Sequence, residues 1–222
     1  MGIAVIIPTL NAEAGLAATL RSVAEAEEVI VIDGGSEDAT VRVAGLAGVR
    51  VATSARGRGQ QLRAGADVAT QDWMLFLHAD TILAPGWRSI VDAHVRRTNA
   101  AATAGVFRFK LDDEAWQARV LEWLVALRVF LFALPYGDQG LLIHRSLYAA
   151  LGGFRPLPLM EDVDFVGRIG RWRLRRLSCA ATTSARRWRE DGWIARSARN
   201  IVCLTLFSFG APIDRIARFY GR

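Results

Sequence analysis

Hydrophobic residues in the first hundred positions fall into two alternating kinds of segment. Short, continuous apolar runs are typical of buried strands, and there are four: Ile3–Ile7, Val29–Ile32, Val49–Thr53 and Trp73–Leu77. Between and after them lie stretches with helical spacing, near Glu13–Ala26, Asp38–Ala47, Gln60–Ala69 and Pro85–Arg97. Buried strands alternating with helices predict an α/β fold, with a mostly parallel sheet flanked by helices on both faces.

The second half of the chain has a different pattern. Residues Thr103–Leu111 alternate as a strand does, and Glu114–Ala133 has the spacing of a long helix with one apolar side: Trp116, Val120, Trp123, Leu124 and Leu127. The remaining predicted elements are strands at Gly140–His144 and Leu174–Cys179 and helices at Arg145–Leu151, Glu161–Gly170, Trp193–Phe209 and Pro212–Tyr220. Without a repeat or linker, residues 1–222 are predicted to form one domain with parts at 1–100, 101–190 and 191–222.

Composition adds a strong preference for arginine. The formal net charge is +6, and Lys110 is the single lysine. Arginine grips phosphate with a two-pronged fork, so the charge favours a nucleotide, a nucleic acid or an anionic membrane as partner. Scattered arginines can also reflect genome composition. No nucleic-acid partner is expected, because the basic residues do not cluster with aromatic pairs.

The apolar stretches and the cysteines bear on location. Val120–Leu134 and Ile201–Ile213 are interrupted or too short to cross a bilayer, so no transmembrane segment is expected. Cys179 and Cys203 have neither disulfide nor metal-ligand spacing and indicate a reducing, cytoplasmic compartment. The apolar helices could instead dock at the inner face of the membrane or on a second copy, as a homodimer. Core packing is the preferred interpretation for most of their residues.

Polar residues follow the first two predicted strands directly. Ligands of parallel α/β sheets bind beyond the carboxyl ends of the strands. After the first strand, Pro8-Thr9-Leu10-Asn11 is a candidate nucleotide-binding segment that includes Pro8. Its Thr9 and Asn11 can bond a base or ribose or cap the next helix. After the second, Asp33 can accept the imide N–H of a pyrimidine, and the glycines that follow, Gly35 among them, allow close approach of the backbone.

Two further segments suit a diphosphate. Arg58 lies in Arg56-Gly57-Arg58-Gly59 before a predicted helix, where backbone N–H groups and the helix dipole favour phosphate. Asp80 ends the fourth strand in His78-Ala79-Asp80, where a carboxylate can hold Mg²⁺ or Mn²⁺ bridging a pyrophosphate. His78 can be a metal ligand, a hydrogen-bond donor to a phosphate group, or a histidine packed in the core.

These four segments, in this order, resemble the nucleotide-binding half of inverting family-2 glycosyltransferases with the GT-A fold. The family pattern is P-x-x-N, D-G-S-x-D-x-T, G-[KR]-G and D-x-D. Here Gly35 is an extra residue, and His78 replaces the first aspartate of D-x-D. The resemblance implies a nucleotide-sugar donor, with UDP expected, bound in residues 1–100. It also implies a hydroxyl acceptor and a divalent metal on Asp80.

The second half carries residues that match the family's catalytic segments. The resemblance implies that Glu161-Asp162 is the family's E-D pair, with Asp162 as the base that takes the proton of the acceptor hydroxyl. It also assigns Glu161 and Asp138 to orienting acceptor or sugar, and Gln139, beside Asp138, is a further candidate. From the residues alone, the preferred interpretation is that Glu161 and Asp162 are charges stabilising a helix N-terminus.

A third segment matches only in part. Arg187-Trp188 supplies the R-W of the Q-x-x-R-W motif found in processive members, but Ser184 replaces the glutamine, which argues against a processive synthase. Arg187 is then a candidate contact of the diphosphate and Trp188 of the acceptor, the alternative being an ordinary arginine beside a packed tryptophan. The whole chain is most similar to small members labelled arsenosugar-biosynthesis or radical-SAM-associated glycosyltransferases.

Two other functions remain open from the sequence. A nucleotidyltransferase would also place carboxylates and metal at strand ends, but it should carry a glycine-rich basic loop after the first strand, where this chain has Pro8 to Asn11. A peripheral membrane or interaction module with a degenerate donor site is the non-enzyme alternative. The donor base, the sugar and the acceptor are not specified by the residues.

Overall fold

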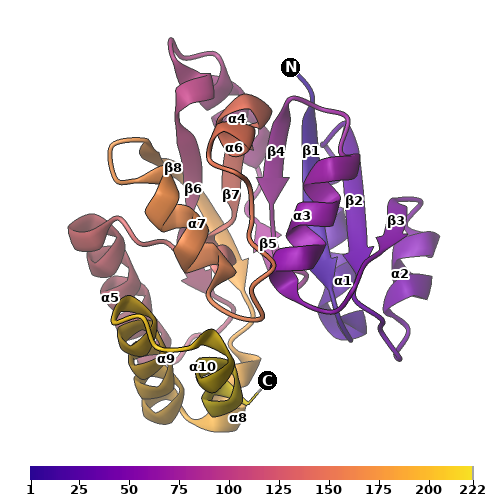
Figure 1. Ribbon diagram of the computed structural model, residues 1–222. Helices are drawn as coiled ribbons and strands as arrows, with labels where there is room; N and C mark the ends of the chain where they lie inside the picture. Colours follow the sequence, from indigo (N-terminus) through magenta and orange to yellow (C-terminus); the bar gives the residue numbers. More distant parts are fainter. Residues whose placement is uncertain (222) are drawn as a thin grey trace.

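The computed structural model describes residues 1–221 and contains one eight-stranded sheet (Figure 1). Its strands lie in the order β3-β2-β1-β4-β7-β6-β8-β5. Their bounds are β1 Ile3–Thr9, β2 Glu28–Asp33, β3 Arg50–Thr53, β4 Trp73–Phe76, β5 Thr81–Leu83, β6 Ala104–Leu111, β7 Leu141–His144 and β8 Leu174–Thr183. Strands from both halves of the chain therefore pair in a single sheet.

The strand pairing is mixed, with a parallel block at one side. Strands β3, β2, β1 and β4 pair in parallel, while β7 runs antiparallel to both β4 and β6. Strands β6 and β8 are parallel to each other, and β5 returns antiparallel to β8. The predicted strands are all present. The sequence missed β5, which is too short to show a period, and the end of β8, which runs past Cys179 to Thr183.

Helices cover both faces of the sheet, as predicted. Residues of α1 (Glu13–Ser22), α2 (Thr40–Leu46) and α4 (Trp87–Val95) pack into one buried cluster with the strands. Residues of α3 (Arg58–Val68), α6 (Arg145–Ala150) and α7 (Glu161–Ile169) pack into a second cluster on the opposite face, the nearer one in Figure 1. Short 3₁₀ turns lie at Ala100–Ala102 (η1) and Gly137–Gln139 (η2).

Four helices gather beside the sheet rather than over it. They are α5 (Trp116–Phe132), α8 (Arg186–Asp191), α9 (Trp193–Ser208) and α10 (Ile213–Tyr220), at the lower left of Figure 1. Short α8 was not predicted. Two small clusters hold the group in place, one between α5 and β6 and one between α9, α10 and the start of α7. No helix within residues 1–221 is long and apolar enough to cross a bilayer.

The prediction that the large apolar residues of α5 pack in the core was wrong. Trp116, Val120, Trp123, Leu124 and Leu127 do share a face, but each of them is exposed. The helix instead buries Ala118, Val125 and Val129 against Phe109 and Leu111 of β6. A helix that is apolar on nearly every side has no periodic signal to identify its buried face.

Candidate functional site

The carboxyl ends of β1 and β2 form one wall of the candidate site. Thr9 and Asp33 lie opposite each other in the parallel register. The Asp33 carboxylate accepts hydrogen bonds from the backbone N–H groups of Gly35 (2.9 Å) and Ser36 (2.8 Å) and from the hydroxyls of Thr9 (3.1 Å) and Ser36 (2.5 Å). Gly35 has φ +91°, a conformation that favours glycine.

These bonds determine the charge of Asp33. Burial alone would raise its pKa, but the four hydrogen bonds outweigh burial and lower the pKa, so the buried side chain is a carboxylate. A carboxylate has about four acceptor positions. Asp33 therefore shapes the turn from within, with its acceptor positions used by the protein itself.

The loops after β1 and β2 are joined by reciprocal hydrogen bonds. The Asn11 N–H donates to the Ser36 hydroxyl (2.9 Å), and the Asn11 side-chain oxygen accepts from the Glu37 N–H (2.9 Å). The Ala12 N–H donates to the Thr40 hydroxyl (2.7 Å). Asn11 itself adopts a left-handed conformation, with φ +50°. The two predicted nucleotide-binding loops thus form one preformed surface.

Gln61, which the sequence analysis did not select, braces this surface from below. The buried Gln61 amide donates to the carbonyls of Thr9 (2.6 Å) and Ile32 (2.8 Å), so it links β1 and β2 where they end. The only signal for this role is a polar residue on the inward side of α3, and that pattern does not distinguish a brace from a ligand. Pro8, also predicted, lies buried within β1.

A buried ion pair joins α3 to α7. Arg58, the first residue of α3, lies 3.3 Å from the carboxylate of Glu161, the first residue of α7. Glu161 is fully buried, while the Arg58 side chain is 22% exposed. Burial alone would lower the pKa of Arg58, but nearby carboxylates, chiefly that of Glu161, raise it. Arg58 is therefore a fixed positive charge between the two halves of the chain.

Gly59 permits this approach. A Cβ on Gly59 would lie 2.2 Å from the Arg155 carbonyl oxygen and 3.0 Å from the Leu157 N–H nitrogen, so a side chain cannot fit without moving backbone. The N-terminus of α3 is pressed against the loop that leads into α7. The glycine in the Arg58-Gly59 motif thus brings Arg58 within reach of Glu161.

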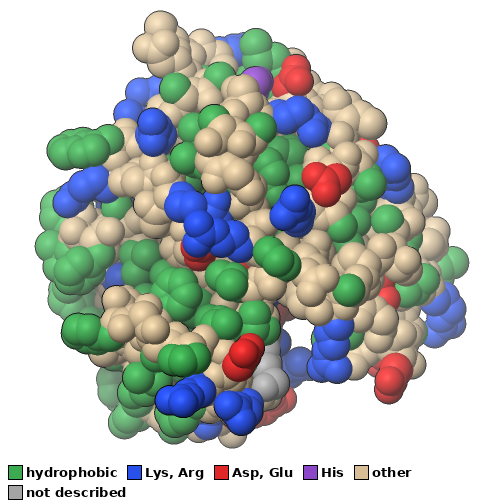
Figure 2. Space-filling view, viewed as in Figure 1, with side chains coloured by type: hydrophobic (Ala, Val, Ile, Leu, Met, Phe, Trp, Pro, Cys, Tyr) green, Lys and Arg blue, Asp and Glu red, His purple; other side chains and the backbone are tan. Residues whose placement is uncertain are grey.

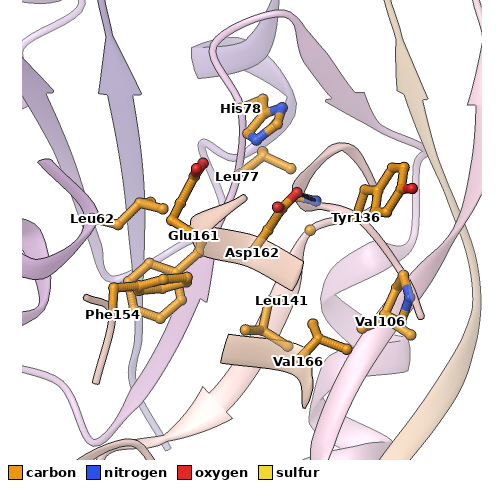
Figure 3. Close-up of a pocket in the computed structure, with 14 residues that line it drawn as sticks. Leu62, Leu77, His78, Val106, Tyr136, Leu141, Phe154, Glu161, Asp162 and Val166 are labelled. Atoms are coloured by element: carbon orange, nitrogen blue, oxygen red, sulfur yellow. Dashed lines mark hydrogen bonds between the residues drawn. The ribbon is translucent and has the colours of Figure 1, made fainter. Parts of the chain in front are cut away.

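Asp162 lies next to the loop at the end of β4 (Figure 3). One carboxylate oxygen accepts from the Gly137 N–H (2.7 Å) and the other from the Val163 N–H (2.8 Å). The His78 ring packs against Gly137, because a Cβ there would lie 2.5 Å from the His78 Nε2 atom. The predicted base and the predicted metal-binding segment, far apart in sequence, are therefore brought together.

Asp138 and Gln139 lie in η2, beside Asp162. Desolvation raises the pKa of Asp138 to about 7, the positive charge of Arg128 opposes that shift, and Asp162 and Asp80 add to it. Gln139 donates to the Phe107 carbonyl (3.1 Å). The Asp138 Oδ1 and Gln139 Oε1 atoms are buried without a hydrogen-bond partner among the described residues. Buried acceptors of this kind are suited to receive hydroxyl groups of a ligand.

The exposed carboxylate of Asp80 has two arginines, Arg58 and Arg187, in its electrostatic environment. Desolvation and the nearby guanidinium of Arg58 lower the pKa of Arg187, although Arg187 as a residue is exposed, and Asp80 acts in the opposite direction. Two guanidinium groups that repel each other are thus held among the carboxylates of Glu161, Asp162 and Asp80, and guanidinium groups are the side chains that bind phosphate best. Asp80, Arg58 and Arg187 are therefore near enough for their charges to act on one another.

The donor set at this position fits a metal that arrives with its ligand. Within residues 1–221, no group of three or more His, Cys, Asp or Glu side chains could hold a metal ion. Magnesium is commonly bound through one or two carboxylates together with substrate phosphates and water. The Asp80 carboxylate, directly before β5, meets that requirement, whereas a permanent structural metal would need more protein ligands.

A small pocket of about 20 Å³ lies against Asp162. Its walls are mostly apolar, with Leu62, Phe76, Phe154 and Val166 among them. Figure 3 shows Glu161 and Asp162 above Phe154 and Val166. The volume is roughly that of one water molecule. It is therefore a small void among packed apolar side chains beneath the two carboxylates, and it is too small to bind a sugar.

Trp188 lies apart from this pocket. It packs in the cluster between α5 and β6, which is the packed position that the sequence left open. Tyr220, in contrast, was missed: its hydroxyl accepts from the Arg196 guanidinium, and the residue lies in the electrostatic environment of Arg58 and Arg187. The last helix therefore reaches the side of the site that holds Arg58 and Arg187, a long-range contact without a local sequence signal.

Residues 4–157 match the family described as "Glycosyl transferase family 2". Among curated proteins, the chain is similar to PGL/p-HBAD biosynthesis glycosyltransferases of Mycobacterium bovis (strain BCG / Pasteur 1173P2) and Mycobacterium tuberculosis (strain ATCC 25177 / H37Ra). Each is 38% identical over 90 residues, covering 36% of this chain and 35% of the relative. The match thus spans about a third of the length of these relatives.

Solved structures share the fold over most of the chain. M. tuberculosis glucosyl-3-phosphoglycerate synthase in complex with Mn²⁺, UDP and glucosyl-3-phosphoglycerate has a TM-score of 0.63 and 21% identity, covering 95% of this chain and 81% of that one. S. aureus TarS 1-349 in complex with UDP-GlcNAc has a TM-score of 0.62 and 18% identity, covering 82% and 59%. At these identities the likeness shows the fold, the predicted α/β arrangement of GT-A proteins.

Proposed function

Because the chain belongs to glycosyl transferase family 2, we propose that it transfers a sugar from a nucleoside-diphosphate sugar to an acceptor hydroxyl. The observation that carries the proposal is the convergence at the end of β4. There, Asp162 of the second half lies against the His78 loop of the first, while Arg58 faces both. A base, an anion site and a metal-binding carboxylate on one side of the sheet are what such a transfer requires.

The proposed donor is a UDP-sugar. The joined loops after β1 and β2 offer Thr9, Asn11 and Asp33 to the nucleoside, and Arg58 and Arg187 offer positive charge to the diphosphate. The synthase and TarS structures that share the fold contain UDP or UDP-GlcNAc, which supports this choice. A divalent ion held by Asp80 would neutralise charge that develops on the departing diphosphate.

The proposed chemistry is one displacement with inversion. As the acceptor oxygen bonds to the anomeric carbon, the bond from that carbon to the diphosphate oxygen breaks, and the acceptor proton passes to Asp162. The N–H groups of Gly137 and Val163 hold the Asp162 carboxylate in place for this step. The buried acceptor atoms of Asp138 and Gln139 are placed to bind hydroxyls of the sugar or acceptor.

Glu161 has a supporting part in this scheme. Its carboxylate is fully buried and paired with Arg58, so it orients the guanidinium toward the diphosphate position. Membership of the arsenosugar-biosynthesis or radical-SAM-associated group stays a prediction, as do the cytoplasmic location and the three parts assigned within residues 1–222.

Product analysis separates this function from nucleotidyl transfer. A purified sample incubated with UDP-sugars, Mn²⁺ and a panel of hydroxyl acceptors should release UDP, whereas a nucleotidyltransferase would consume UTP and release pyrophosphate. The variant Asp162→Asn should lose UDP release while it still binds UDP. Wild-type transfer by this variant would show that Asp162 is not the base.

A further inference from the structure

Large apolar side chains are exposed together on one side of the molecule. Of the nineteen large hydrophobic residues that are exposed within residues 1–221, fourteen lie on α5, α9 and α10 or directly after α9. We call this the α5–α10 surface; its members are Trp116, Val120, Trp123, Leu124, Leu127, Phe130, Leu131, Phe132, Ile194, Ile201, Val202, Leu206, Phe209 and Phe219. Figure 2 shows this apolar concentration at the lower left, over these helices.

The exposed residues of the α5–α10 surface are not the ones that attach these helices to the rest of the protein. The inner face of α5 is already packed, because Ala118, Val125 and Val129 fill the contact with β6. On α9 and α10, Cys203 and Ile216 fill the contact with the start of α7. The outer residues are additional: Trp123 is 63% exposed and Phe209 87%. Contiguous apolar area of this kind indicates a partner surface.

Charge distinguishes among partners. Residues 186–220 contain seven arginines against three acidic residues, so they carry four of the six net positive charges of the chain. Two of the acidic residues are paired locally, Glu190 with Arg186 and Asp191 with both Arg196 and Arg199. At the α5 side, the Arg176 guanidinium lies 5.8 Å from the Phe130 ring. The exposed apolar residues of α9 and α10 are thus flanked by arginine, which favours an anionic lipid surface.

A second copy of the chain fits the positive charge of this surface less well than an anionic lipid does. A twofold interface places the same patch of both copies face to face, so the arginines of one copy would lie near those of the other. Tryptophan and phenylalanine beside arginine are instead the side chains typical of helices that lie in the headgroup region of a bilayer.

We propose that the α5–α10 surface docks this protein on membranes that contain anionic lipids. The helices lie along the bilayer, with Trp116, Trp123 and Phe209 inserted among the headgroups and arginines at the rim. Because α10 packs beside Leu159 and Met160, which precede Glu161, docking would hold the candidate site near the membrane. The surface does not depend on the proposed transfer activity.

Vesicle co-sedimentation tests the proposal directly. The wild-type chain should bind vesicles of phosphatidylcholine mixed with phosphatidylglycerol, more weakly as salt is added, and should bind phosphatidylcholine alone poorly. The double variant Trp116→Ser/Trp123→Ser should bind at least about tenfold more weakly, since two large apolar groups no longer leave water. Trp172→Ser is the matched control, because Trp172 is 84% exposed but lies in the turn before β8.

A second readout keeps the test independent of the variants' folding. Brominated phospholipids should quench part of the tryptophan fluorescence of the wild-type chain, because Trp116 and Trp123 reach the bilayer. Absence of both quenching and co-sedimentation overturns the proposal. So does a stable dimer, measured by light scattering, that binds no vesicles, or vesicle binding that Trp172→Ser reduces as much as the double variant. UDP titration of the same samples reports separately on the donor site.

Discussion

The ion pair between Arg58 and Glu161 should contribute both to the stability of the fold and to binding of the nucleotide donor, because Arg58 takes part in each. The two side chains lie 3.3 Å apart, with Glu161 fully buried and Arg58 22% exposed. The variant Arg58→Met removes the cation from the proposed diphosphate site and takes the positive charge of Arg58 away from the buried Glu161 carboxylate. Both effects follow from one substitution, and they can be separated.

The stability effect can be estimated from the burial of the pair. Breaking a buried ion pair by removing one partner costs roughly 3–5 kcal/mol. Partial exposure of Arg58 puts the expected loss for Arg58→Met near the lower end, about 3 kcal/mol. At about 2–4 °C per kcal/mol for a chain of this size, the midpoint of thermal unfolding should fall by about 6–12 °C.

A second substitution, at Glu161, separates the effect of the buried charge on stability from the effect on UDP binding. In Arg58→Met/Glu161→Gln neither charge of the pair remains, so unfolding in urea should show that at least half of the lost stability returns. Calorimetric titration should show weak UDP binding in both variants, because Arg58 is absent from each. Arg63→Met, at an exposed position of the same helix, is the control and should change neither quantity. A double variant as unstable as Arg58→Met, or normal UDP affinity without Arg58, would refute this reasoning.

Two further predictions concern Asp138 and Gly59. Because burial raises the pKa of Asp138 to about 7, the folded protein keeps a proton that the unfolded chain releases near pH 4, so this group's contribution to stability should fall as pH rises from about 4 to about 7. Urea unfolding across that range should show the fall in wild type relative to Asp138→Asn, and equal slopes would contradict the assigned burial. Gly59→Ala should lose about 1–3 kcal/mol, since its Cβ would lie 2.2 Å from the Arg155 carbonyl oxygen. Gly45→Ala, which meets nothing within 4 Å, should be neutral or gain about 0.5–1 kcal/mol, and similar unfolding midpoints for the two variants would show that the contact is absent.

The pattern of strands and helices was largely predictable because local periodicity carries it. Continuous apolar runs became β1 to β4, and their carboxyl ends placed Thr9 and Asp33 side by side. The outward face of α5 was not predictable, since an apolar helix gives no sign of which side is buried. Its inner face was selected by the shape of β6, which accommodates Ala118 and Val125.

Within the site, too, some residues could be found from the sequence, whereas others depend on tertiary packing. Motif order brought Arg58, Asp80 and Asp162 into consideration, and the structure brings them together. The pairing of Arg58 with Glu161 depends on contact between α3 and the loop before α7, which no local pattern specifies. The positions of Gln61 and Tyr220 likewise follow from tertiary packing alone.

Calorimetric titration with UDP, GDP, CDP and TDP, with and without Mn²⁺, tests the donor site most directly. We expect one diphosphate, UDP, to bind with an affinity that rises when Mn²⁺ is present, and we expect Asp80→Ala to lose that dependence. Failure of a folded sample to bind any of the four diphosphates, with or without metal, would contradict the proposal that this chain uses a nucleotide-sugar donor.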